Sequence, residues 1–299
     1  MASLGAPPAK IVLCADDFAL NPGVSSAILA LVDKGRLSAV SGLTTMQGWR
    51  EQAKDLALRA DRVAIGLHLD LSARPFSGAR PAYPIGALLW QGALGRLDVA
   101  DLAKEFERQF DAFEEAVGRA PDHVDGHHHV HVFLQIRDAL VATLSRRYAQ
   151  APIHQRPLVR IPSDSARAIL ARRAALHKAL FVAAMSAGLR ERLRREGFPC
   201  NEGFSGFSRF GKGRSFDEEL DLFLKSPGRR HMIMCHPGLA ETKAGAADPL
   251  VKRRREEEEY ETLLARADLP SWLFRVERRG GEANAFAQWL EDKTIEDGQ

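Results

Sequence analysis

Polar, titratable side chains follow short apolar runs at several separate places in this 299-residue chain. The run "CADDF" carries the pair Asp16 and Asp17, "IGLHLDL" carries His68, and "MCHPG" carries His236. The densest of these motifs is "VDGHHHVHVF" (124–133), which places four of the ten histidines within five positions. Aspartate and histidine in such separate motifs predict one shared site if the fold brings them together.

The chemistry that these residue types favour is metal-assisted hydrolysis. Carboxylate oxygens and imidazole nitrogens are common ligands of divalent ions, and three protein ligands leave positions open for water and substrate. Such an ion lowers the pKa of its bound water to about 7 and polarises a carbonyl oxygen. A second carboxylate nearby is a natural general base, and a histidine on the far side could protonate a leaving group. The set therefore indicates hydrolysis of an acyl or a phosphoryl bond.

Each motif alone has a simpler interpretation. An Asp-Asp pair after a strand most often serves a turn or a helix cap. His68 between two leucines is more often a packed histidine than a ligand, and His236 before Pro-Gly could simply end a strand. The histidine cluster lies mid-chain with Val130 inside it, which excludes a purification tag and leaves a folded site or a loose surface metal tract. One loop seldom supplies four ligands to one ion, so we expect most of these histidines to line the pocket or begin the next helix.

The elements that must position these residues alternate along the chain. Strands are predicted at 10–15, 37–45, 62–69, 122–127, 158–162, 230–236 and 272–278. Helices are predicted at 21–35 and through the apolar repeat from Leu102 to Val117. Strands separated by helices favour a mostly parallel sheet with right-handed crossovers. Seven or eight such units predict an α/β fold, a TIM-like and distorted (β/α) barrel that forms one domain over 1–299, in which the carboxyl ends of the strands carry the chemistry.

Two charged segments stand outside this pattern. Residues 163–215 predict an inserted helical segment, and from Arg160 to Glu196 the chain holds nine Lys or Arg against three Asp or Glu. A helix pair packed on the barrel with a solvated basic face is one interpretation. A substrate lid, or a surface that meets a lipid-linked sugar or an anionic membrane, is the other. The run "KRRREEEEYE" (252–261) predicts an exposed helix with i,i+4 ion pairs and no chemistry.

Composition narrows the class of protein. The balance of 42 basic and 39 acidic residues gives a formal charge of +3, which does not favour nucleic acid as a partner. Cys14, Cys200 and Cys235 form no CxxC motif, which is typical of a reducing compartment rather than a disulfide framework. The sequence shows neither a signal peptide nor an apolar run of about 18 residues. We therefore expect a soluble cytoplasmic protein without a transmembrane segment.

In this order and spacing, "CADDF", "IGLHLDL", "VDGHHHVHVFLQI" and "MCHPG" resemble the family of YdjC-like carbohydrate deacetylases, which includes chitooligosaccharide deacetylase and hopanoid-associated branches. The resemblance covers roughly residues 10 to 265, and the histidine motif is its most specific part. It implies a distorted (β/α) barrel, a divalent metal cofactor, and removal of an acetyl group from an N-acetylated amino sugar. The substrate it implies is a small carbohydrate or a glycolipid.

Carried over by motif, the resemblance implies Asp17, His68 and His127 as metal ligands. It implies Asp16 as the base that activates water. The choice of Asp17 over Asp16 as the ligand borrows from the wider polysaccharide deacetylases, and the reverse assignment stays open.

The same resemblance implies His236 as the acid that assists departure of the amine. Asp125 would accept a hydrogen bond from a histidine of the site and fix its tautomer. Arg160 is a candidate for holding substrate oxygen atoms. The chain departs from the family at Ala19, where the family often has glycine, so the turn there needs a conformation that alanine tolerates.

Three hypotheses stay open at this point: an amino-sugar deacetylase, a phosphoesterase on the same scaffold, and a non-catalytic metal- or sugar-binding module. Two imidazoles favour zinc, whereas the family is often described with magnesium. Many barrels of this kind form homo-oligomers, but the sequence does not determine the oligomeric state. It does not identify the sugar either.

Overall fold

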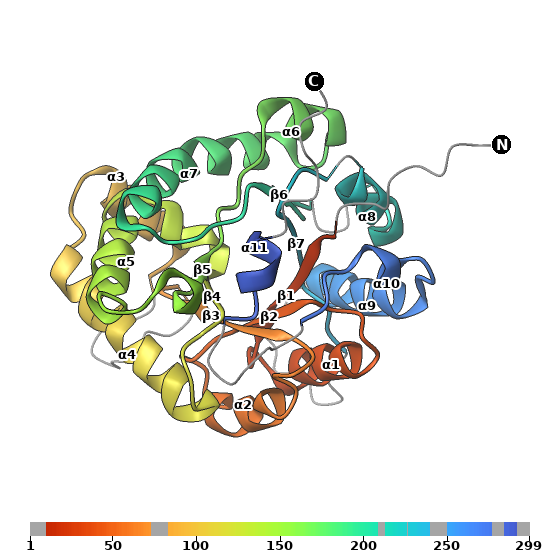
Figure 1. Cartoon of the computed structure of the whole chain (residues 1–299). Coiled ribbons are helices and arrows are strands. Elements are labelled where there is room, and N and C mark those ends of the chain that lie inside the picture. The colour runs from red at the N-terminus through yellow and green to blue at the C-terminus, as the bar shows by residue number, and fades with distance from the viewer. Residues whose placement is uncertain are drawn as a thin grey trace.

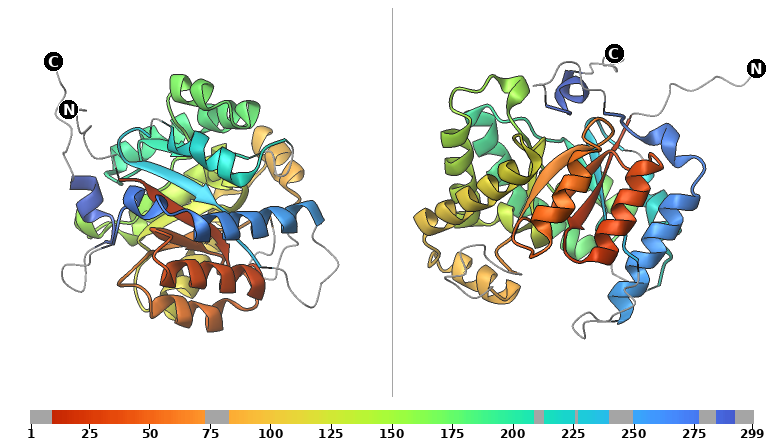
Figure 2. Two further views of the ribbon diagram at one scale, coloured as in Figure 1. Left: turned by 90° about the vertical axis from the view of Figure 1, so that its right-hand side faces the viewer. Right: turned by 90° about the horizontal axis from the view of Figure 1, so that it is seen from below.

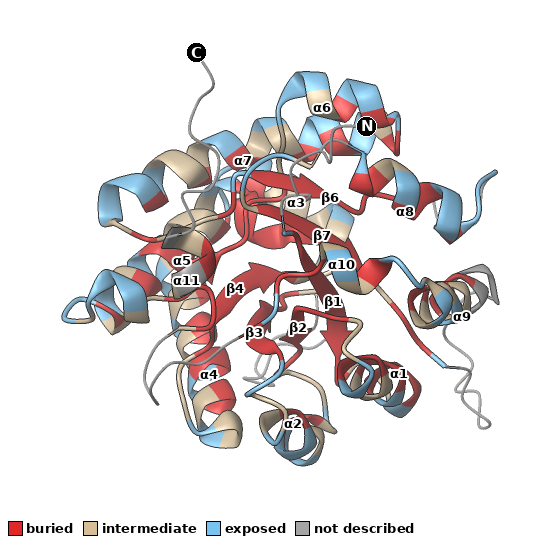
Figure 3. Cartoon of the chain, turned by 45° about the vertical axis from the view of Figure 1, so that its right-hand side comes forward, coloured by how far each residue is buried: buried red, intermediate tan, exposed pale blue. Residues whose placement is uncertain are grey.

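Seven parallel strands form the central sheet, in the order β5-β4-β3-β2-β1-β7-β6 (Figure 1). The strands are β1 (Val12–Phe18), β2 (Ala39–Gly42), β3 (Ala64–Leu69), β4 (His123–Gly126), β5 (Leu158–Val159), β6 (Gly203–Ser205) and β7 (His231–Cys235). This computed structural model describes residues 10–72, 83–208, 213–225, 227–239, 250–276 and 284–291. Every residue of the seven strands is buried, as expected for a parallel sheet that is covered by helices (Figure 3).

Helices surround the curved sheet. They are α1 (Pro22–Asp33), α2 (Trp49–Ala57), α3 (Ile85–Ala93), α4 (Val99–Val117), α5 (Leu134–Arg147), α6 (Ala166–Arg172), α7 (Leu176–Glu196), α8 (Phe216–Leu224), α9 (Leu250–Ala265), α10 (Leu269–Trp272) and α11 (Ala287–Glu291), with the 3₁₀ helices η1 (His127–Val132) and η2 (Ile153–Gln155). The short helix α11 lies at the amino-terminal end of the strands (Figure 2). The polar motifs lie at the opposite end of the sheet, at the carboxyl-terminal ends of the strands.

Helices α1 and α4 show how local sequence sets these elements. Asn21 caps α1 by accepting a hydrogen bond from the main chain of Val24 at 2.9 Å, and Pro22 fits the first turn. Helix α4 begins at the cap Asp98 and ends at Gly118, whose φ of 79° is favourable for glycine. Its apolar stripe is buried as the periodicity predicts, at Leu102, Phe106, Phe110 and Phe113.

The edge strand β5 meets the segment just before the other edge strand, β6, through an isolated bridge between Val159 and Cys200. The Val159 amide donates to the carbonyl of Pro199 at 2.8 Å. Beyond it, the side chain of Asn201 replaces the missing strand: its Oδ1 accepts from the Ile161 amide at 2.7 Å and its Nδ2 donates to the Ile161 carbonyl at 2.9 Å. The sheet therefore curls into a distorted, TIM-like barrel, and the predicted fold class is confirmed.

Six of the predicted strands are present, most of them shorter than predicted. The prediction at 272–278 is wrong over its described part, where α10 ends at Trp272 and Leu273 makes only a single bridge to Ile11; residues 277 and 278 lie outside the described residues. The inserted segment 163–215 does contain a helix pair, α6 and α7. It also contains β6, which the sequence analysis missed because three residues carry no readable alternation.

Candidate metal centre

The two aspartates that end β1 face different partners. The pairing of β1 with β2 shifts register between Ala15 and Phe18, and Asp17 adopts a φ of 66°. Adjacent residues of a regular strand point to opposite faces, so this irregularity at Asp17 allows both carboxylates to reach the same end of the barrel. Asp16 contacts Arg160, whereas Asp17 contacts two histidines. The two carboxylates of the "DD" pair therefore have separate partners, an arginine for Asp16 and two histidines for Asp17.

Asp17, His68 and His127 bring three ligand-type atoms together. Oδ1 of Asp17 lies 2.8 Å from Nδ1 of His127 and 3.3 Å from Nε2 of His68. The three ligand atoms all lie within 4.8 Å of one another. The Asp17 oxygen is buried and reaches hydrogen-bond geometry with no described residue, although two imidazole nitrogens are close. Metal-ligand atoms that converge without hydrogen bonds between them fit a bound cation. One carboxylate with two imidazoles suits Zn²⁺ or another divalent ion.

The charges around this group are strongly coupled. Burial alone would raise the pKa of Asp17, but the positive charge of His127, together with that of His68, holds it well below its usual value. Burial alone would lower the pKa of His68, but the charges of Asp125 and Asp16 raise it to about 10. Without a metal ion, the centre is therefore an ion-pair cluster in which positive histidine compensates buried carboxylate.

Asp125 lies directly behind His68. The register of β3 and β4 pairs these two residues, and Nδ1 of His68 lies 2.5 Å from Oδ1 of Asp125. The other carboxylate oxygen accepts from Ser41 at 2.7 Å and lies 3.0 Å from Arg160. The contact expected for Asp125, with a histidine of the site, is thus present, and it leaves Nε2 of His68 facing Asp17.

Arg160 is fully buried and faces Asp16. Its two terminal nitrogens each donate to one Asp16 oxygen at 2.7 Å, a parallel, bidentate arrangement. The guanidinium carbon also lies 5.7 Å from the centre of the Phe204 ring. This placement differs from the expected contact with substrate oxygens, because the guanidinium lies behind Asp16 and its terminal nitrogens contact carboxylates.

The four histidines of the cluster point to four different environments. His127 begins η1 and contributes to the centre, whereas His128 is exposed, with Nδ1 3.2 Å from Ser72 Oγ. His129 is buried against the Phe207 ring, and Nε2 of His131 lies 2.8 Å from the carbonyl oxygen of Arg160. His128 and His129 have φ values of 55° and 59°, a left-handed turn, and the rings of His127 and His128 stay close, with their centres 4.0 Å apart. The cluster is therefore a folded part of the site.

His236 follows β7, on the strand that pairs with β1. Its main-chain amide donates to the Glu259 carboxylate at 2.5 Å, and the amide of Gly238 donates to the Glu256 carbonyl at 3.0 Å. Burial lowers the pKa of the His236 imidazole, while the charges of Asp17 and Asp16 act to raise it. Helix α9 therefore fixes the backbone that carries His236 at the rim of the site.

This role corrects the interpretation of "KRRREEEEYE" as an exposed helix. The helix is present, but Arg255, Glu256 and Glu259 are buried. Arg255 donates to Glu259 at 3.1 Å and to Glu219 of α8. Burial raises the pKa of Glu259 to about 7, although Arg255 acts to lower it. No apolar periodicity in this segment signals the burial; the i,i+4 spacing of Arg255 and Glu259 is the one signal present.

The inserted segment reaches the site through α7, which packs against η1. Lys178 of α7 places its ammonium 5.7 Å from the centre of the Phe207 ring. Phe207 in turn lies against Phe204 and His129. The segment thus forms a wall of aromatic rings and one cation beside the histidine cluster.

With this geometry established, comparison with known proteins identifies the family. Residues 10–272 match the profile of the YdjC-like proteins. The chain belongs to the YdjC-like family. It is 36% identical over 145 residues to chitooligosaccharide deacetylases of Yersinia pestis (strain Pestoides F) and Yersinia pseudotuberculosis (serotype O:1b), and the match covers 46% of this chain and 55% of each relative. The similarity thus spans about half the length of these curated relatives.

A solved structure supports the architecture. A protein of Enterococcus faecalis V583, described as a proposed cellobiose-phosphate cleavage protein, superposes with a TM-score of 0.60 at 20% identity. The superposition covers 90% of this chain and 97% of the other. Within the described residues, no helix is long and apolar enough to cross a bilayer.

Proposed function

We propose that this YdjC-like protein is a metal-dependent hydrolase that removes the N-acetyl group from an N-acetylated amino sugar, either a chitooligosaccharide or a lipid-linked glucosamine. The observation that carries the proposal is the convergence of Asp17, His68 and His127 beside a second carboxylate, Asp16, that is held separately. The name of the Yersinia relatives supports the substrate class. Family membership supports the reaction type.

Asp17, His68 and His127 are the residues that would hold the divalent ion. Once bound, an ion such as Zn²⁺ or Mg²⁺ supplies a Lewis acid that polarises the acetyl carbonyl and acidifies water. Asp16 takes the proton from the attacking water, because its carboxylate lies at the same strand end and is kept apart from the ligand set. Arg160 fixes the orientation of Asp16 through its two hydrogen bonds.

His236 donates a proton to the departing amine. It follows β7, the strand beside β1, and the charges of both aspartates act on its imidazole. Protonation of the nitrogen is required because an amide anion is too basic to leave at neutral pH. Base and acid are thus assigned to two residues on adjacent strands.

Phosphoester hydrolysis is the main competing reaction on such a scaffold. Two-metal phosphoesterases bind two ions a few ångströms apart with a larger set of carboxylates and histidines. Among the described residues, the two other groups of ligand-type atoms both include Asp125, which already contacts His68. A single ion with a separate base therefore favours the acyl reaction.

Acetate release tests the proposal directly. Purified protein loaded with Zn²⁺ or Mg²⁺ should release acetate from a panel of N-acetylglucosamine oligomers and glycolipids. Asp16→Asn should bind the ion as the wild type does and lose at least a hundredfold in rate, because it retains the shape of the base without its basicity. Cleavage of a phosphate ester without any acetate release would overturn the proposal in favour of a phosphoesterase. Metal binding with no turnover of either kind would support a binding module.

A further inference from the structure

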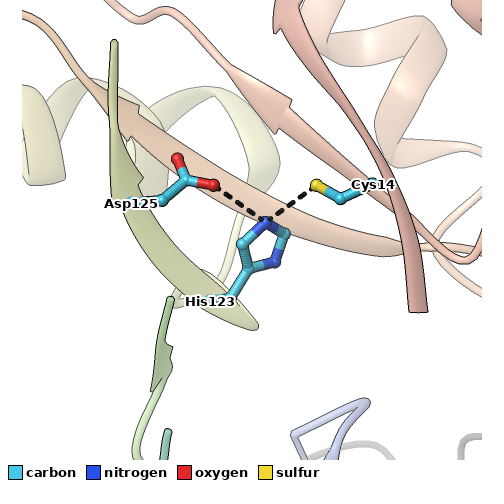
Figure 4. A group of neighbouring side chains, drawn as sticks. All are labelled: Cys14, His123 and Asp125. Carbon is cyan, nitrogen blue, oxygen red and sulfur yellow. Dashed lines mark hydrogen bonds and ion pairs between the residues drawn. The ribbon is translucent and has the colours of Figure 1, made fainter. Parts of the chain in front are cut away.

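A second group of ligand-type atoms lies buried inside the barrel, beneath the candidate metal centre. It consists of Cys14 on β1 with His123 and Asp125 on β4 (Figure 4). Sγ of Cys14 lies 3.6 Å from Nε2 of His123, which lies 3.8 Å from Oδ2 of Asp125. Thiolate, imidazole and carboxylate form a donor set that could bind zinc, so its actual role has to be decided from the neighbouring contacts.

The hydrogen bonds of the Ser41 hydroxyl on β2 indicate whether this group binds an ion. It lies 2.8 Å from Nε2 of His123 and donates to Oδ2 of Asp125 at 2.7 Å. Because its one proton is used toward Asp125, Ser41 accepts the hydrogen bond from the Nε2–H of His123. Its oxygen also lies 3.6 Å from Sγ of Cys14. An ion bound by all three ligand atoms would have to break both short hydrogen bonds of Ser41.

The protonation states agree with hydrogen bonding rather than metal binding. Burial and the charge of Asp16 hold the pKa of Cys14 well above its usual value, so the sulfur stays a thiol. Burial lowers the pKa of His123, so its ring is neutral and carries one proton. The geometry places that proton on Nε2, toward Ser41.

These contacts form one chain of hydrogen bonds that ends at the metal centre. His123 donates to Ser41, Ser41 donates to Asp125, and the other oxygen of Asp125 accepts from Nδ1 of His68 at 2.5 Å. With an ion bound, a proton kept on Nδ1 leaves the lone pair of Nε2, the nitrogen that faces Asp17, for the ion. The orientation of the Asp125 carboxylate therefore governs which nitrogen His68 presents to an ion.

We infer that Ser41 and His123 are positioning residues of the metal centre, which act through Asp125 on the ligand His68. The inference rests on the metal centre of the proposed function. It gives a physical reason for a buried polar chain that would otherwise only cost desolvation.

The residues around His123, at the far end of this chain of hydrogen bonds, hold its imidazole ring in place. A Cβ on Gly66, the strand partner of His123, would lie 2.2 Å from the imidazole, so glycine is needed to seat it. Phe286, just before α11, meets the same ring edge-on with the ring centres 5.7 Å apart. Cys14 covers the side toward β1. His123 is thus clamped, and it can hold Ser41 in one orientation.

The affinity for Zn²⁺, measured by competition with a chromophoric chelator, tests the inference without any substrate. Ser41→Ala should weaken binding about 10- to 100-fold, the effect typical of removing a partner of a metal ligand. Ser38→Ala is the matched control: it removes an equally buried hydroxyl just before the same strand, where Ser38 donates to the carbonyl of Phe274 at 2.8 Å. That variant should bind Zn²⁺ as the wild type does.

A second variant acts from the far end of the chain. His123→Phe keeps an aromatic ring over Gly66 and removes the donor to Ser41, so it should also weaken Zn²⁺ binding. The double variant should lose little more affinity for Zn²⁺ than Ser41→Ala alone, because both residues act through the carboxylate of Asp125. Thermal unfolding of the metal-free variants separates this effect from loss of folding, and either single variant suffices if the other does not fold.

The outcomes distinguish this inference from the proposed function. Equal affinities in Ser41→Ala, His123→Phe and the wild type would overturn the inference and leave the deacetylase proposal standing. No uptake of Zn²⁺ by the wild type would overturn both. Loading with Co²⁺ gives the last readout: a thiolate charge-transfer band that disappears in Cys14→Ala would place an ion at Cys14, and would refute the hydrogen-bond chain.

Discussion

Arg160 holds Asp16 through two parallel hydrogen bonds of 2.7 Å, although 144 residues separate the two in sequence. The same guanidinium lies 3.0 Å from Asp125, the carboxylate behind His68. One buried cation therefore compensates both the proposed base and the residue that supports a proposed metal ligand. The positions of the two carboxylates depend on each other through Arg160.

Removal of the Arg160 guanidinium should lower the stability of the fold. Arg160→Met leaves two buried carboxylates without their positive partner, and we expect it to lower the free energy of unfolding by roughly 3–5 kcal/mol. Arg50→Met is the matched control, because Arg50 also contacts both oxygens of a carboxylate, that of Glu115, but on the exposed surface. Its expected cost is below about 1 kcal/mol. Urea unfolding measures the free energy of unfolding of both variants. Equal losses in the two would show that the buried ion pair contributes no more to stability than the exposed one.

The ligand set predicts the metal content of three histidine variants. His68→Ala and His127→Ala should each lose the ion, because each removes one of three converging donors. His128→Ala should retain it, since His128 is exposed and turned toward Ser72. Elemental analysis after dialysis against a weak chelator measures the stoichiometry. Loss of the ion in His128→Ala with retention in His127→Ala would move the ligand by one position within the cluster.

The left-handed conformation of Ala19 predicts an unusual response to glycine. Ala19 has a φ of 72° and is nearly fully buried, so Ala19→Gly loses packing of one methyl group but relieves about 1–2 kcal/mol of backbone strain. Ala27→Gly removes an equally buried methyl group from the middle of α1 and gains no such relief. We expect Ala19→Gly to be more stable than Ala27→Gly by at least about 1 kcal/mol in urea unfolding. The reverse order would mean that the turn after β1 is not strained.

Glu259 predicts a pH dependence of stability. Its pKa is about 7 in the fold and near 4.5 when exposed, so between these values the folded protein binds more protons than the unfolded chain. Stability should therefore fall as the pH rises from about 4.5 to 7, by up to roughly 3 kcal/mol, and then level off. Glu259→Gln mimics the protonated form and should remove this decline.

Chemical unfolding of both proteins at several pH values between 5 and 8 measures the effect. Glu258→Gln removes the same formal charge from the neighbouring position, whose side chain is 37% exposed, and so separates net charge from burial. A Glu259→Gln variant that follows the wild type at every pH would contradict the buried proton.

The sequence predicted the convergence of the motifs because position at a strand end is a local signal. Asp17, His68 and His127 each follow or end an apolar run, and a parallel barrel gathers such ends at one rim. The contact between His68 and Asp125 was also within reach, because both lie in quoted motifs on strands that pair. Their catalytic and metal-binding roles stay predictions.

The partners behind these residues could not be predicted in the same way. Ser41 and His123 become neighbours only through the register of β2, β3 and β4, which no single motif encodes. Glu259 is buried although its helix has no apolar stripe, because Arg255 and two carboxylates bury one another. Tertiary pairing of polar groups leaves no periodic signal in a sequence.

The closure of the barrel by Asn201 has a consequence for how this protein can vary. At the junction of β5 and β6 a side-chain amide replaces a ladder of main-chain bonds, and the chain between Ile161 and Asn201 leaves and returns at that junction. Both ends of α6 and α7 are thus anchored by one residue, and no continuous pairing has to be preserved across them. A change in the helical segment beside the histidine cluster should accordingly leave the centre on β1, β3 and β4 in place, so that the wall of the site can vary separately from its centre.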